Sequence, residues 1–142
     1  MIQKSVPSKG NYKKIAHTIF QQISHIDKAV IFLNGPVGAG KTTFAQTLVE
    51  FYGCNKIQSS SFAIVTTIPG TRNIIHCDFY RYFPNEEFWD CEILPLLGNQ
   101  YLLLIEWGHP NAFLHDASHF CFNITAMTDG SRSVRFTEII TD

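Results

Sequence analysis

Residues 35–44 read GPVGAGKTTF, a spacing typical of a loop that binds the phosphates of a nucleotide. Gly35 is followed by four residues and then by Gly40, Lys41 and Thr42. Glycines at these places let backbone N–H groups approach an anion, while the lysine adds charge at the outer phosphates and the threonine hydroxyl can ligate Mg²⁺. A plain glycine-rich turn would not explain the Lys-Thr pair. The predicted contacts to the nucleotide are Gly35, Val37, Gly38, Ala39, Gly40, Lys41, Thr42 and Thr43.

The segments on either side of this loop have the patterns that the motif requires. Residues 29–33 are wholly apolar, as expected of a strand that is covered on both faces. Residues 41–52 place apolar side chains at helical spacing, and Gly53 follows where a helix C-terminal cap belongs. Strand, loop and helix in this order support nucleotide binding.

Two carboxylates are predicted to reach the same place. Residues 62–68 and 72–77 are expected to form a hairpin whose second strand ends at Asp78, and the apolar strand 101–105 ends at Glu106. Ligands of open α/β sheets bind at the carboxyl ends of the strands. We therefore expect Asp78 to ligate Mg²⁺, and Glu106 to orient the attacking water and contribute to the metal site.

Three further residues near these motifs each allow two interpretations. His76 faces the same side of its strand as Asp78 and either supports the site or packs in the core. Arg81 either reaches phosphates or a partner's acidic group, or is a solvated surface arginine. Trp107 either stacks on a base or a partner, or belongs to the core.

The remaining patterns complete an α/β domain. A helix is expected over residues 12–23, a short helix loosened by Pro95 over 88–97, and an antiparallel strand pair over 119–124 and 133–139. We expect a three-layer domain of the P-loop NTPase type over residues 11–142, with a mainly parallel central sheet and antiparallel additions. Residues 1–10 are expected to form a flexible tail.

Composition restricts the function further. The net charge of -1 offers no broad surface for nucleic acid, so any RNA is expected to be contacted only indirectly. The four cysteines have no metal-binding spacing, which favours reduced thiols. The longest apolar runs are far shorter than the ~18 residues of a membrane span. We expect a cytoplasmic protein without a membrane partner.

Four motifs together resemble one known family. They are GPVGAGKTTF at 35–44, SSSF at 59–62, HCDFYR at 76–81 and IEWG at 105–108, and they are similar to those of TsaE, the ATPase of bacterial tRNA threonylcarbamoyladenosine synthesis. The resemblance extends over about residues 11–139. One departure is Ser60, where the family usually has proline.

The resemblance implies ATP and Mg²⁺ as cofactors and roles for particular residues. Thr42 and Asp78 would help to hold Mg²⁺, Ser61 would lie in a switch-like loop, and Glu106 would be needed for hydrolysis. TsaD-like and TsaB-like proteins would be the partners and would carry the transfer chemistry on tRNA.

Two other functions stay open from the residues alone. A small-molecule P-loop kinase would need cationic groups that close over the transferred phosphate, yet residues 82–131 contain no lysine or arginine. A nucleotide-gated binding module without significant turnover would have less use for Glu106. We therefore favour a weak ATPase, in which Lys41 and Glu106 are the catalytic residues.

Overall fold

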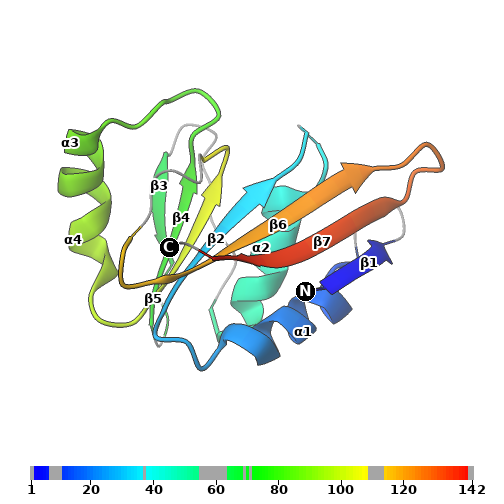
Figure 1. The fold of residues 1–142 in the computed structure, drawn as a ribbon, viewed down its shortest axis with the longest axis horizontal. Coiled ribbons are helices and arrows are strands. Elements are labelled where there is room, and N and C mark those ends of the chain that lie inside the picture. The colour runs from blue at the N-terminus through cyan, green and yellow to red at the C-terminus, as the bar shows by residue number, and fades with distance from the viewer. Residues whose placement is uncertain are drawn as a thin grey trace.

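The computed structural model of the chain describes residues 2–6, 11–36, 38–54, 64–68, 70, 72–108 and 114–140. A twisted sheet runs through the molecule, with helical segments on both of its faces (Figure 1). The strands are β1 (Ile2–Val6), β2 (Lys28–Asn34), β3 (Val65–Ile68), β4 (Asn73–Asp78), β5 (Tyr101–Glu106), β6 (Ser118–Ala126) and β7 (Arg132–Ile139). The helical segments are α1 (Lys13–Ile23), α2 (Lys41–Phe51), α3 (Glu86–Phe88), the π-helical turn η1 (Trp89–Ile93) and α4 (Leu94–Leu97).

The strand order confirms the predicted fold class. The seven strands are arranged β1-β7-β6-β2-β5-β4-β3. The four central strands β6, β2, β5 and β4 are mutually parallel, while β3 joins one edge and β7 and β1 join the other in antiparallel pairing. The chain is therefore an α/β protein with a parallel centre and antiparallel additions, as its sequence pattern predicts.

The apolar run of β2 is buried because the sheet is covered on both sides. Successive side chains of a strand point to opposite faces. Ala29, Ile31 and Leu33 accordingly pack into one core, and Val30 and Phe32 pack into the other. This central position fixes the end of β2, from which the phosphate-binding motif begins.

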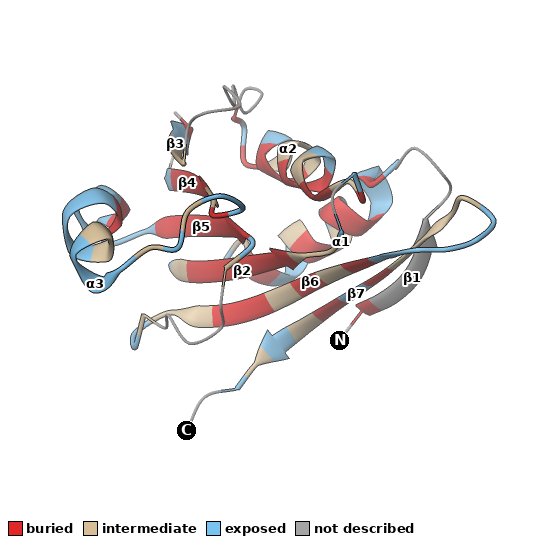
Figure 2. Ribbon diagram, turned by 90° about the horizontal axis from the view of Figure 1, so that it is seen from above, coloured by how far each residue is buried: buried red, intermediate tan, exposed pale blue. Residues whose placement is uncertain are grey.

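One face of the sheet is covered by α1 and α2, which lie side by side (Figure 2). Phe44 of α2 stacks on Phe122 of β6 with ring centroids 3.7 Å apart, and both side chains are fully buried. Gly53 ends this helical region with a φ of 78°, a left-handed conformation that glycine adopts without strain. These contacts hold the N-terminus of α2 at the carboxyl end of β2.

The other face is covered by the consecutive short segments α3, η1 and α4, from which Ile93 and Leu97 are buried. The sequence predicts one short helix here, and the structure divides it. The Leu94 N–H bonds to the Trp89 carbonyl five residues earlier, which makes the turn π-helical. Pro95 follows directly and has no N–H to continue a regular ladder, and the segment ends at Gly98 with a φ of 66°.

One sequence-based expectation needs correction. Residues 2–6, expected to be a loose tail, form β1 and pair with β7, with Ile2 buried. This short segment is ordered by pairing with the edge of a strand that is distant in the sequence. The local residue pattern does not reveal such pairing. The first hairpin strand, expected over residues 62–68, begins at Val65, and residues 62–63 lie outside the described part of the chain.

Within the described ranges, no helix is both long enough and apolar enough to cross a membrane.

Candidate nucleotide-binding site

Side chains from distant parts of the sequence contact the glycine-rich loop and restrict its conformation. Gly40 has a φ of 107°, and a Cβ at this position would lie 2.5 Å from the Tyr12 hydroxyl oxygen. The Tyr12 hydroxyl donates a hydrogen bond to the Ala39 carbonyl at 3.0 Å, and Arg132 Nε donates to the same oxygen at 3.2 Å. Glycine at position 40 is therefore required by both backbone conformation and space.

Lys41, the first residue of α2, is buried, with 5% of the residue exposed to solvent. Its Nζ donates to the Gly35 carbonyl at 2.5 Å and lies 3.6 Å from the centroid of the Trp107 ring. Burial lowers the pKa of Lys41, and the negative charges of Glu106 and Asp78 oppose this shift. A cation held in this way can interact strongly with an anion that enters the loop.

Glu106 is the centre of a buried polar cluster. The Thr42 hydroxyl donates to its carboxylate, at 3.0 Å from Oε2 and 3.3 Å from Oε1. His76 Nε2 lies 2.6 Å from the same Oε2, and both His76 and Glu106 are 3% exposed. Because a carboxylate only accepts hydrogen bonds, His76 acts as a donor through Nε2. His76 thus both contacts Glu106 and is buried, and its role in a nucleotide site stays a prediction.

Asp78 lies beside Glu106 at the same sheet edge, because the register of the parallel strands β4 and β5 pairs these two residues. Its Oδ1 accepts the N–H of Tyr80 at 3.0 Å, and its negative charge acts on Lys41. The predicted convergence of one lysine and two carboxylates is therefore present in the fold.

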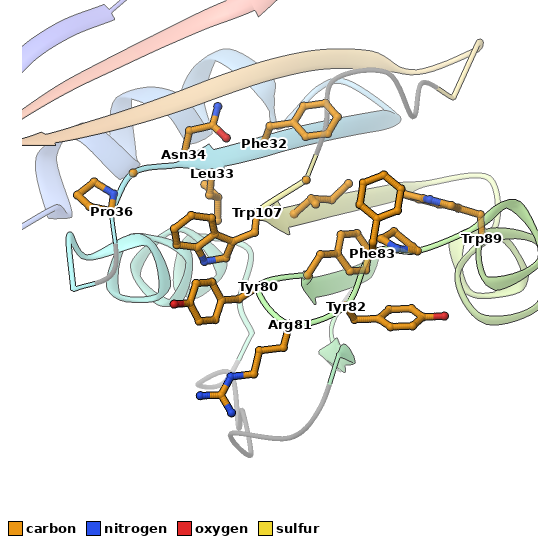
Figure 3. A pocket seen from close by; sticks show the side chains of 15 residues that line it. Phe32, Leu33, Asn34, Pro36, Tyr80, Arg81, Tyr82, Phe83, Trp89 and Trp107 are labelled. Atoms are coloured by element: carbon orange, nitrogen blue, oxygen red, sulfur yellow. The ribbon is translucent and has the colours of Figure 1, made fainter.

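Trp107 forms a wall between Lys41 and a neighbouring cavity. Its φ of 60° is positive, a conformation uncommon for a residue with a side chain. This turn places the indole against Lys41 on one side and against Tyr80, whose ring centroid is 4.9 Å away, on another. Figure 3 shows Trp107 between Pro36 and Tyr80 at the edge of the cavity. Trp107 is thus partly exposed at the cavity and is not a core residue, and its stacking on a base or a partner stays a prediction.

Two residues that contact the phosphate loop were not predicted from the sequence. Several residues that were predicted lie outside the described part of the chain. Tyr12 and Arg132, which support the Ala39 carbonyl, come from distant parts of the chain and carry no local signal. Val37 and Ser61 lie outside the described residues, as do Ser59 and Ser60. The roles of the predicted site residues stay predictions.

The donor set fits a magnesium nucleotide. No group of three or more His, Cys, Asp or Glu side chains able to hold a metal occurs among the described residues. Mg²⁺ is commonly bound by one or two protein oxygens together with nucleotide phosphates. The Thr42 hydroxyl and the carboxylates of Asp78 and Glu106 are oxygen ligands of this kind, gathered beside a buried lysine.

Comparisons with known proteins identify the family. The model of the family "Threonylcarbamoyl adenosine biosynthesis protein TsaE" matches residues 6–134. TsaE of Rickettsia conorii is 33% identical over 105 residues, which are 71% of this chain and 58% of that protein. TsaE of Haemophilus influenzae is 29% identical over 121 residues, or 82% of this chain and 75% of that protein.

A solved structure supports the fold. The crystal structure of Bacillus subtilis YdiB is similar with a TM-score of 0.66 and 23% identity, covering 99% of this chain and 89% of that one. The aligned region spans less than two thirds of the length of the R. conorii relative. Since the family model covers most of the sequence, the chain belongs to the TsaE family, which is named for threonylcarbamoyl adenosine biosynthesis.

Proposed function

We propose that this protein binds ATP with Mg²⁺ and hydrolyses it slowly, in support of tRNA threonylcarbamoyladenosine modification by a TsaD/TsaB-type complex. The observation that carries this proposal is the Thr42 hydroxyl on the Glu106 carboxylate, next to a buried Lys41. Three separate chain segments supply the parts of a phosphoryl-transfer site at one sheet edge. Family membership gives the pathway in which such a site would act.

The loop residues would hold the phosphates. Backbone N–H groups at the N-terminus of α2, together with the loop glycines, form an anion-binding surface. Lys41 would act on the outer phosphates, where it balances the charge that develops during transfer. Ser61 and Trp107 complete the proposed set of nucleotide contacts.

Mg²⁺ would be held by Thr42, Asp78 and Glu106. When bound, the ion neutralises phosphate charge and helps to position the phosphates. The chain's own contribution is to hold these oxygen ligands at the ends of β4, β5 and the phosphate loop.

Glu106 would orient the attacking water. Its carboxylate is fixed by Thr42 and by His76, so its rotation is restricted before any nucleotide arrives. An oriented carboxylate accepts a hydrogen bond from water in a defined direction, which favours in-line attack on the outer phosphate. Turnover is expected to be slow without partners.

The partners would be TsaD-like and TsaB-like proteins in the cytoplasm, and these would carry the chemistry on tRNA. The net charge of -1 fits a protein that contacts tRNA only indirectly. The small-molecule kinase is less favoured, because the chain from 82 to 131 offers no lysine or arginine to close over a transferred phosphate.

The test is ATP hydrolysis by the purified protein, alone and with TsaD and TsaB, with Glu106→Ala as the control. We expect the partners to stimulate hydrolysis and the variant to lose it. Tight ATP binding without turnover in either setting would instead support a nucleotide-gated binding module. Transfer of phosphate to a small-molecule acceptor would support the kinase.

A further inference from the structure

Exposed apolar side chains gather on the part of the molecule next to Trp107. Tyr80 is 53% exposed, Phe83 is 76% exposed and Trp107 is 36% exposed. Leu94 and Leu96 of α4 are exposed as well. We call Tyr80, Phe83 and Trp107 the aromatic rim. Large apolar groups clustered on a surface in this way commonly mark a binding site.

The aromatic rim borders a cavity of about 1210 Å³. Its walls come from the end of β2, the segment 79–84, Trp89 of η1 and the residues around Trp107 (Figure 3). Its volume lies somewhat above the ~300–1,000 Å³ of typical small-molecule sites, so it is large enough to receive a polypeptide segment. Gly35 and Trp107, two of the predicted nucleotide contacts, line this cavity, whereas Lys41 and Glu106 do not, so the cavity adjoins the proposed phosphate site.

The charges near the cavity disfavour the binding of nucleic acid. Arg81 lines the cavity. The acidic Glu86, Glu87 and Asp90 are exposed on α3 and η1, the segment that also supplies the lining residue Trp89. No lysine or arginine occurs between residues 82 and 131. The acidic surface beside the cavity would repel RNA phosphates and attract the basic side chains of a polypeptide, while Arg81 is the charged residue of the lining itself.

We propose that this cavity receives a segment of a partner protein that inserts an apolar side chain against the aromatic rim and carries lysine or arginine beside it. Aromatic residues are enriched in the cores of protein interfaces, and a few of them usually supply most of the binding energy. The proposal rests on the proposed function in taking the TsaD/TsaB-type complex as the source of that segment.

Trp107 connects the cavity with the proposed nucleotide site. The indole lines the cavity and lies 3.6 Å from Lys41 Nζ. A segment that moves this ring also changes the surroundings of the lysine. Because coupling between two binding sites is reciprocal, ATP and the partner segment alter each other's affinity by the same factor.

The first experiment measures the affinity of the full chain for the purified TsaD/TsaB complex by calorimetry. Phe83→Asp is expected to weaken binding by about tenfold or more, since it places a charge in an apolar contact. Ile140→Asp is the matched control, because Ile140 is 85% exposed and follows β7 at the opposite end of the sheet from the cavity. ATP affinity of the isolated Phe83→Asp chain is expected to match that of wild type.

The second experiment identifies the occupant. A photo-crosslinking phenylalanine analogue at position 83 is expected to label a partner segment that contains an apolar residue next to lysine or arginine. The double variant Glu86→Lys, Glu87→Lys is expected to weaken binding and to reduce its dependence on salt.

The outcomes separate the two proposals. Unchanged partner affinity in Phe83→Asp, or a crosslink to RNA, to an acidic segment or within the chain itself, would overturn the inference and leave the proposed function intact. Absence of any binding between the wild-type chain and the complex would overturn both.

Discussion

The two faces of the sheet are covered in different ways. On one face, α1 and α2 bury Ile15, Ile19, Phe44 and Leu48 in a continuous core. On the other face, α3, η1 and α4 are only a few residues long and leave a cavity beside the aromatic rim. The well-packed face holds the helix that begins at Lys41, where positions must be fixed. The loosely covered face has the exposed apolar surface that we propose as the binding site of a partner.

The largest effect is expected from a substitution that removes a buried side chain from the well-packed face and so creates a cavity there. Phe44→Ala removes a fully buried ring that stacks on Phe122 and meets Tyr12 edge-on. We expect a loss of about 3–5 kcal/mol in the free energy of unfolding, measured by urea denaturation. A loss below about 1 kcal/mol would show that this face is no better packed than the other.

A smaller effect is expected from the buried polar cluster. His76→Ala removes the imidazole whose Nε2 lies 2.6 Å from the Glu106 carboxylate, and that buried carboxylate then loses a hydrogen bond. We expect the free energy of unfolding to fall by about 1–3 kcal/mol. His25→Ala, at an exposed position, is the control and should have little effect. Equal stability of both variants would contradict the role given to His76.

The third prediction concerns thiol labelling on the loosely covered face. Burial raises the pKa of the Cys77 thiol to about 12, whereas Cys91 of η1 is exposed. Because the thiolate is the reactive form, we expect a thiol reagent at pH 8 to label Cys91 quickly and Cys77 only when the structure opens. The triple variant Cys54→Ser, Cys91→Ser, Cys121→Ser isolates the slow reaction of Cys77. Labelling of Cys77 as fast as that of Cys91 would mean that the cover of α3, η1 and α4 opens constantly.

The smallest effect is expected at the aromatic rim. Phe83→Ala removes the same ring as Phe44→Ala, but from a residue that is 76% exposed. The free energy of unfolding should change by no more than about 0.5 kcal/mol in the same denaturation experiment. A large loss would indicate that Phe83 is needed for folding, and the surface would then be explained without a partner.

The sequence predicts the parallel centre of the fold and the meeting of Lys41, Asp78 and Glu106, because these follow from local rules. An apolar strand followed by a glycine loop fixes one position, and strands that end in acids fix the others. Local patterns did not predict β1, which is ordered by pairing with β7, nor the π-turn that precedes Pro95. Contacts between distant segments, such as Arg132 with Ala39, leave no pattern in one sequence.

The central claim is that Lys41, Thr42, Asp78 and Glu106 form one site for Mg²⁺ and ATP, in which binding and hydrolysis depend on different residues. Its most direct test is calorimetric titration of ATP with Mg²⁺ into the wild-type chain, Lys41→Ala and Glu106→Ala, with turnover measured on the same samples. We predict saturable binding that requires Mg²⁺, is abolished in Lys41→Ala and is retained without turnover in Glu106→Ala. Equal loss of binding in both variants would contradict the role of Glu106, and no binding by the wild-type chain would contradict the site itself.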